Sequence, residues 1–230
     1  MCFSATASFT AGAGLLVIGA ITIRLSRDRA ELPFAAIPVL FGVQQLIEGA
    51  LWLTFPDKAP LLNAILTHIY SLFSHVLWPV YVPIAVLLLE PISWRRRVLA
   101  WITVAGGAVG LYLLYYLITQ PLVAQVEGQH ITYISPHFYT VPVMIFYILS
   151  TCVSSLFSSC GTVRSFGFVS LLASGAAGAF YSVWFISVWC FFAAILSAII
   201  LLHFIRQSAS RSDPAEAANS ARSVMNQRSD

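Results

Sequence analysis

In this chain of 230 residues, 59% of the residues are hydrophobic and only 9% are charged. Ordinary soluble domains carry about 25% charged residues, so the chain is predicted to lie in a lipid bilayer rather than in water. The net charge of +3 does not indicate a nucleic-acid partner, because the basic residues fall in short clusters between apolar runs.

Long apolar runs follow one another along the whole chain. A helix needs roughly 20 apolar residues to cross a hydrocarbon core of about 30 Å. The runs cover residues 5–23, 32–55, 61–89, 98–119, 132–157 and 166–205. As a single helix the last run would extend about 60 Å, so we expect it to fold back near residues 181–183. The sequence therefore predicts an all-α bundle of seven transmembrane helices.

The basic residues predict how this bundle is oriented. With the N-terminus outside, eleven of the twelve Lys and Arg residues fall in cytoplasmic segments, and only Lys58 falls outside. An excess of positive charge on the cytoplasmic side is the usual pattern in membrane proteins. We therefore expect a multi-pass protein of the bacterial inner membrane with a cytoplasmic C-terminus. Residues 1–205 are its transmembrane domain, and residues 206–230 are predicted to form a disordered cytoplasmic tail.

Small residues and prolines mark two helices. Gly106 and Gly110 form a G-x-x-x-G pair in the fourth predicted helix, and this spacing lets helix backbones approach closely. We expect packing inside the bundle, with a homodimer contact as the alternative. Pro79 and Pro83 interrupt the third predicted helix, where they remove backbone donors and are expected to bend it.

Glu48 is the only acidic residue inside a predicted span. A carboxyl group in a bilayer is costly, and a functional role is the default hypothesis for one. Gln44 and Gln45 precede it by four and three residues, so all three share one helical face. The second predicted helix thus carries a polar stripe, which serves either a function or hydrogen bonding between helices.

Histidines add to this polar set. His68 and His75 are seven residues apart, close to two helical turns, so both are expected on one face of the third helix. Counting inward at 1.5 Å per residue places four reactive side chains from four helices in the outer third of the bilayer and His75 deeper, about 20 Å in. These four are Glu48, His68, His137 and Cys190.

Imidazole and carboxylate groups bind zinc and other transition metals, and they also form intramembrane proton relays. One hypothesis assigns a divalent metal such as zinc to Glu48, His68 and His137. The leading hypothesis is a transporter or sensor that binds a proton, a metal ion or a small solute in the outer half of the bundle. The alternatives are a metal-dependent membrane hydrolase, whose catalytic residues the sequence does not identify, and a structural scaffold.

The four cysteines give no metal-binding spacing and are expected to be small buried residues. They are Cys2, Cys152, Cys160 and Cys190.

Three stretches resemble an uncharacterised family of bacterial seven-helix membrane proteins. They are Met1 to Thr6 (MCFSAT), Phe41 to Trp52 (FGVQQLIEGALW) and Ser187 to Ala194 (SVWCFFAA). With the hydrophobic pattern, the resemblance extends over residues 1–205. It implies a fold and a topology, and it implies no activity.

Overall fold

The computed structural model describes residues 4–56, 58–128, 130–135, 137–138, 140–180 and 185–211. The side chains of residues 179–180, 185–191, 193–194 and 209–211 lie outside this description.

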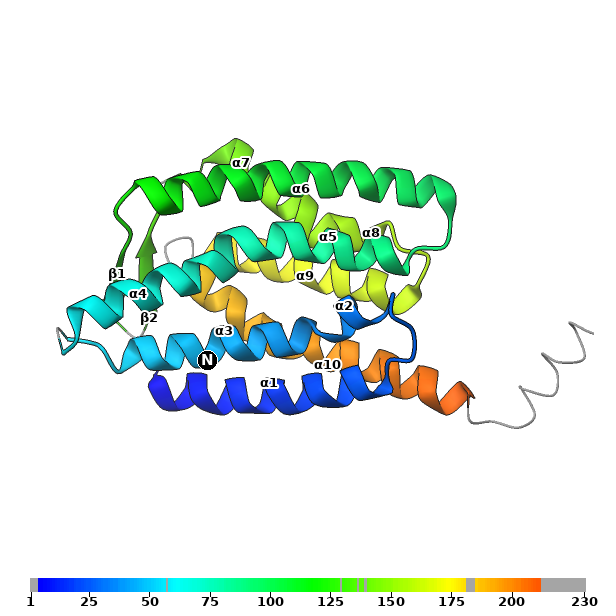
Figure 1. The fold of residues 1–230 in the computed structure, drawn as a ribbon, viewed down its shortest axis with the longest axis horizontal. Helices are drawn as coiled ribbons and strands as arrows, with labels where there is room; N and C mark the ends of the chain where they lie inside the picture. Colours follow the sequence, from blue (N-terminus) through cyan, green and yellow to red (C-terminus); the bar gives the residue numbers. More distant parts are fainter. Residues whose placement is uncertain are drawn as a thin grey trace, which may run out of the picture.

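Seven helical rods lie side by side in the described part (Figure 1). Two of them contain a short π-helical stretch, named η1 or η2. In chain order the rods are α1 (Ala5–Leu25); α2 (Leu32–Ala35) with α3 (Ile37–Trp52); α4 (Pro60–Ser71), η1 (Leu72–Leu77) and α5 (Trp78–Leu89); α6 (Ser93–Thr119); α7 (Val141–Ile148), η2 (Leu149–Val153) and α8 (Ser154–Leu156); α9 (Gly161–Phe180); and α10 (Phe185–Arg211).

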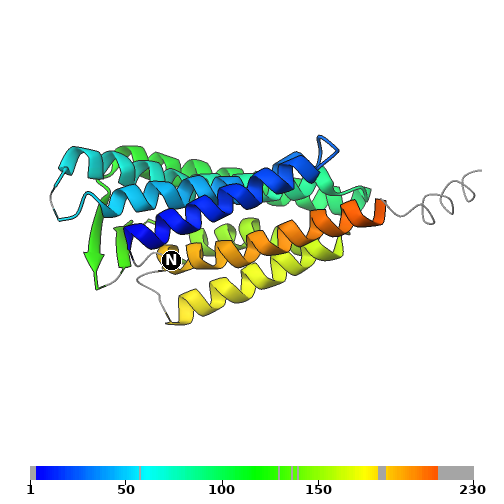
Figure 2. The same ribbon diagram turned by 90° about the horizontal axis from the view of Figure 1, so that it is seen from below.

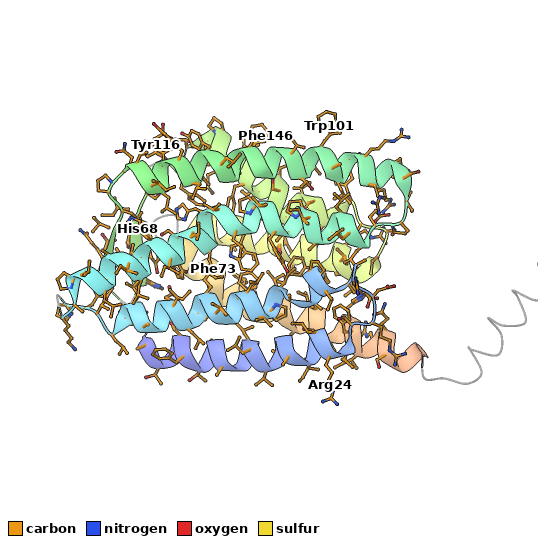
Figure 3. All side chains as sticks on the ribbon, viewed as in Figure 1. Arg24, His68, Phe73, Trp101, Tyr116 and Phe146 are labelled. Atoms are coloured by element: carbon orange, nitrogen blue, oxygen red, sulfur yellow. The ribbon has the colours of Figure 1, made fainter. Side chains whose placement is uncertain are left out.

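The bundle has two ends of different character. One end carries the basic side chains at the end of α1 and at the start of α6 and α9, and we call it the arginine end. The other end carries a β-hairpin and the turn that contains Lys58, and we call it the hairpin end (Figure 1). Figure 3 shows Arg24 near the first end and His68 near the second.

Four helices of the described part are long and apolar enough to cross a membrane, namely Ala5–Leu25, Leu32–Trp52, Pro60–Leu89 and Ser93–Thr119. Large apolar side chains cover their outer surfaces, as Trp101 does at 74% exposure (Figure 3). An apolar outside of this extent fits a membrane protein, because soluble monomers rarely expose one.

A two-stranded antiparallel sheet follows α6 and corrects the all-α prediction. Strand β1 (Val123–Glu127) pairs with β2 (His130–Ile134), with Glu127 opposite His130. Gly128, in the two-residue connection, has a φ of 64°, which favours glycine. The helix predicted from residue 132 therefore begins only at Val141. Tyr133 packs inward instead, stacked on Tyr70 of α4 with ring centroids 4.5 Å apart.

The long apolar run at the end of the chain folds back, as predicted. It divides into α9, which ends at Phe180, and α10, which begins at Phe185. The two helices pack side by side (Figure 2). The predicted reversal at residues 181–183 lies outside the described residues. Helix α10 continues to Arg211, beyond the end predicted at residue 205; residues 212–230 of the predicted tail are not described.

Helix α6 packs closely on the rod formed by α4, η1 and α5. A Cβ atom placed on Gly106 would lie 2.0 Å from the carbonyl oxygen of Pro79, and one on Gly110 would lie 2.8 Å from Val80 Cγ2. The G-x-x-x-G face is thus occupied inside the bundle, as expected, rather than free for a second copy of the chain.

Candidate functional site

A cavity of about 230 Å³ lies at the hairpin end of the bundle and brings together two of the predicted site residues, His75 and His137. Its other lining residues come from the last two turns of α6, the segment that follows, and the end of β2. They are Leu113, Tyr116, Leu117, Gln120, Pro121, Leu122, Ile134 and Ser135. The lining combines buried His75 with exposed residues such as Gln120 and Ile134, so the cavity connects the interior with the surface.

His75 has one engaged and one free ring nitrogen. The ring is only 2% exposed, and its Nδ1 lies 2.8 Å from Ser74 Oγ. The Ser74 hydroxyl also lies 3.4 Å from the Ser71 carbonyl and can donate to it, so either atom of the Ser74–His75 pair can be the donor. His75 Nε2 is buried and has no hydrogen-bond partner among the described residues.

The π-helical stretch η1 carries this histidine, and its cause is in the sequence. Pro79 has no N–H, so a carbonyl in the preceding turn loses its intrahelical donor. The hydroxyl of Tyr147 on α7 donates to the carbonyl of Ser74 instead. Single π-helical turns of this kind occur frequently at functional sites. The π-helical stretch thus ends just before Pro79, whereas Pro83 lies inside α5.

His137 approaches the cavity from the segment between β2 and α7. Its ring stacks on Tyr116 of α6, with centroids 3.7 Å apart and planes 19° from parallel. The next residue, Phe138, packs against the His75 ring at 4.4 Å. Figure 3 places Tyr116 on α6 near the hairpin end. One short segment thus carries one imidazole of the cavity and, through Phe138, contacts the other.

The polar stripe predicted on α3 is present but does not line this cavity. Glu48 is completely buried, and Gln45 Nε2 donates to its carboxylate (3.3 Å). Gln44 Oε1 accepts from Trp78 Nε1 (2.8 Å), and Trp78 stacks on Phe41 with centroids 3.9 Å apart. The stripe therefore ties α3 to α5 through side chains.

His68 does not share the cavity with His75. It is partly exposed on α4, and its Nδ1 donates to the carbonyl of Ala64 in its own helix (2.8 Å). The prediction of one common face assumed α-helical geometry, and η1 lies between the two residues. A π-helical turn holds more residues than an α-helical one, so a spacing of seven no longer returns to the same face.

The predicted metal ligands are not brought together in the described part of the chain. No three His, Cys, Asp or Glu side chains come close enough there to hold a metal ion. Glu48 lies in the α3 stripe, His68 bonds to its own helix, and His137 stacks on Tyr116. The side chain of Cys190, also placed in the site by sequence, lies outside the described residues.

The Tyr147 contact gives a testable prediction. Replacing Tyr147 with phenylalanine leaves the Ser74 carbonyl without its donor, and an unsatisfied buried group costs about 1–3 kcal/mol. We expect a lower midpoint of thermal unfolding in detergent. Tyr115→Phe is the control, because Tyr115 is 62% exposed. Equal midpoints for the two variants would contradict the role of Tyr147 in supporting η1.

Residues 1–218 match the sequence profile of a family of unknown function, DUF6629. The chain belongs to this family. No curated protein and no solved structure shows significant similarity to it. The match extends beyond residues 1–205, over which the sequence resembles an uncharacterised family.

One of the stretches that carried this resemblance, residues 41–52, forms most of α3. Besides Glu48 and the two glutamines, it contains Gly42, which packs on Gly12 of α1. A Cβ atom on either glycine would lie 3.0 Å from the carbonyl oxygen of the other. The same helix thus places its small residues against α1 and its polar side chains toward the interior.

Proposed function

We propose that this chain is a seven-span protein of the bacterial inner membrane that binds a proton or a small uncharged solute in the cavity lined by His75 and His137. It acts as a transporter or a sensor. The observation that carries the proposal is the buried Nε2 of His75, which lacks a partner among the described residues although its ring lines a cavity. Buried polar atoms are normally paired, and each exception needs an explanation.

The proposed topology rests on the charges at the two ends. Arg24, Arg95 and Arg164 lie at the arginine end, whereas Lys58 lies at the hairpin end. The positive-inside rule then places the arginine end in the cytoplasm. The cavity would accordingly open outside, where a solute from the periplasm can enter.

The chemistry of the lining limits the ligand. Among the described lining residues none is Asp, Glu, Lys or Arg, so neither an anion nor a metal cation finds an opposite charge. When Nδ1 carries the proton, His75 Nε2 accepts a hydrogen bond from an O–H or N–H group or takes up a second proton; when Nε2 carries it, Nε2 donates to an oxygen of the solute. At roughly 30 Å³ per water, the volume of about 230 Å³ corresponds to about eight waters, which suits a small solute.

Conformational change in this proposal involves η1. The stretch lies between α4 and α5, and its Ser74 carbonyl accepts from Tyr147 of another rod. A change in the backbone hydrogen-bond pairing of η1 would rotate His75 relative to the cavity. The binding state of Nε2 would thereby be coupled to the contact between α7 and η1.

Carbethoxylation by diethyl pyrocarbonate tests the proposal, because this reagent attacks unprotonated imidazole nitrogens. In full-length protein reconstituted in lipid, we expect modification at His75. Glycerol or urea, as small uncharged donors, should slow the reaction at His75 and leave His68 unchanged. Mass spectrometry of the peptides measures both sites in one sample. A His75 that stays unmodified while the protein is folded would contradict an accessible binding cavity.

Matched variants separate binding from general effects of the solutes. In the His75→Phe variant we expect glycerol or urea to lose the part of its thermal stabilisation that is specific to the cavity. His68→Phe, on the same rod but away from the cavity, should keep the wild-type response. The same response in all three proteins would favour the purely structural interpretation of the polar residues.

A further inference from the structure

A second pair of reactive side chains lies at the arginine end, remote in sequence from the cavity residues. Cys160 immediately precedes α9, and His203 lies on α10. The Cys160 Sγ and His203 Nδ1 atoms are 3.9 Å apart. Both side chains are partly exposed. Among the cysteines with described side chains, Cys160 therefore departs from the expectation of a small buried residue.

The backbone around Cys160 adds to this arrangement. Its carbonyl accepts from Arg164 N (3.0 Å), which makes Cys160 the residue that caps the start of α9. Amide groups at a helix start are unpaired within the helix and favour negative charge. The hydrogen bond with His203, helped by the Val163 amide and opposed by burial, lowers the pKa of the Cys160 thiol to about 7.

Aromatic rings hold the imidazole of His203 in place. The ring of Phe34 meets it edge-on at 6.3 Å and 88°, and that of Phe204 at 5.0 Å and 74°. A base whose orientation is fixed next to a nucleophile is the geometry of thiol activation.

The charged groups on the neighbouring elements are engaged elsewhere. Glu90 accepts from Ser159 N (2.6 Å), and Glu31 accepts from Gln207 Nε2 (2.8 Å) on α10. Arg95 donates to the carbonyls of Phe157 and Ser158. Two further arginines lie near the pair in sequence, Arg164 on α9 and Arg206 on α10. The two acids thus have other partners.

We infer that Cys160 and His203 form a nucleophilic thiol–imidazole pair, a modification site at which Cys160 is oxidised by a peroxide. The inference is independent of the proposed binding cavity. Low-pKa, accessible cysteines are those that peroxides oxidise first. Cys152 provides the internal comparison, because it is fully buried and contacts Thr151 Oγ1 at 3.5 Å.

The reaction with hydrogen peroxide balances as a two-electron step. The Cys160 thiolate attacks one peroxide oxygen, an S–O bond forms, and the O–O bond breaks. Sulfur is oxidised to a sulfenic acid, and the leaving hydroxide takes a proton from the His203 imidazolium to become water. A second thiol, such as glutathione, reduces the product through a mixed disulfide.

Alkylation by iodoacetamide as a function of pH tests the pair in the full-length protein. We expect the rate at Cys160 to rise with a midpoint near pH 7, as the thiolate forms. His203→Phe keeps an aromatic ring between Phe34 and Phe204 but removes the nitrogen. It should move the midpoint toward the ordinary value of about 8.5, slowing labelling at pH 7 by roughly tenfold.

Peroxide treatment followed by dimedone provides the second measurement. The dimedone adduct is expected at Cys160 and not at Cys152, and it should decrease in His203→Phe. His68→Phe serves as the control and should leave Cys160 unaffected. Two results would overturn the inference. One is an alkylation midpoint of wild-type Cys160 near that of a free thiol, which needs no variant. The other is dimedone labelling of Cys160 that is the same in wild type and in folded His203→Phe.

Discussion

Replacing Gly106 with alanine is expected to lower the stability of the bundle by at least about 2–3 kcal/mol, at the upper end of the usual cost of overpacking. The added methyl group would lie 2.0 Å from the Pro79 carbonyl oxygen and 3.0 Å from Ser150 Oγ. The first neighbour is backbone, which cannot turn aside as a flexible side chain can. Helix α6 must therefore move away from α5 and η2.

Gly107 offers a control at the adjacent position of the same helix. A methyl group there meets no atom within 4 Å. Because alanine is a better helix former than glycine by about 1 kcal/mol, Gly107→Ala should be neutral or stabilising. The two changes add the same atoms and are expected to have different signs. Thermal unfolding of both variants in detergent measures this, and equal destabilisation would contradict the packing of α6 on Pro79.

The Gly106 prediction also concerns the candidate site. Pro79 lies in the first turn of α5, directly after the π-helical stretch that contains His75. The end of α6 supplies Tyr116 to the cavity, and Gln120 follows it. A displacement of α6 at Gly106 is expected to alter the carbethoxylation rate of His75. Gly107→Ala should leave that rate unchanged.

The sequence could predict the helical rods because each one is a long apolar run. It could also predict the close packing at Gly106, since only small residues permit it. The sequence analysis did not predict the hairpin, although its turn signal is recognisable. Two residues, the first of them Gly128, separate two short runs that contain valine, isoleucine and tyrosine. The apolar run that begins at residue 132 assigns residues 132–134 to the following helix instead.

The composition of the site was harder to predict than the fold. His75 and His137 were both singled out, but grouping residues by depth also brought in His68 and Glu48, which face other surroundings. Depth in the bilayer gives the position of a residue along the bundle axis, but not the direction in which its side chain points. The π-helical stretch also changes the rotation of His75 about the helix axis. Tyr116 gave no signal of its own, because its part in the site depends on the turn that brings His137 against it.

The pair of Cys160 and His203 could not be predicted from spacing at all. The two residues lie 43 positions apart, and only the packing of α9 against α10 brings them together. Apolar patterns indicate that these helices fold back on each other but do not fix their register.

Removing the carboxyl group of Glu90 should be the other strongly destabilising change, at about 2–3 kcal/mol. Glu90 is 1% exposed and follows the last residue of α5. Its carboxylate accepts from Ile92 N (3.1 Å) and from Ser159 N (2.6 Å), and it thereby joins the turn between α5 and α6 to the turn between α8 and α9. Hydrogen bonds to charged groups contribute about 1.5–3 kcal/mol each, and the nearby solvent reduces their sum.

Glu90→Ala leaves two backbone amides without an acceptor, whereas Glu90→Gln retains one acceptor oxygen and should have an intermediate effect. Glu127→Ala is the control, because Glu127 is exposed in the hairpin and accepts from Thr132 of the same hairpin. Thermal unfolding in detergent ranks the three variants. A Glu90→Ala protein as stable as Glu127→Ala would show that the two turns are held together by other contacts. Ser159 directly precedes Cys160, so Glu90→Ala is also expected to change the alkylation rate of the Cys160 thiol. One variant in the turn between α8 and α9 thus affects both the stability of the bundle and the reactivity of the thiol.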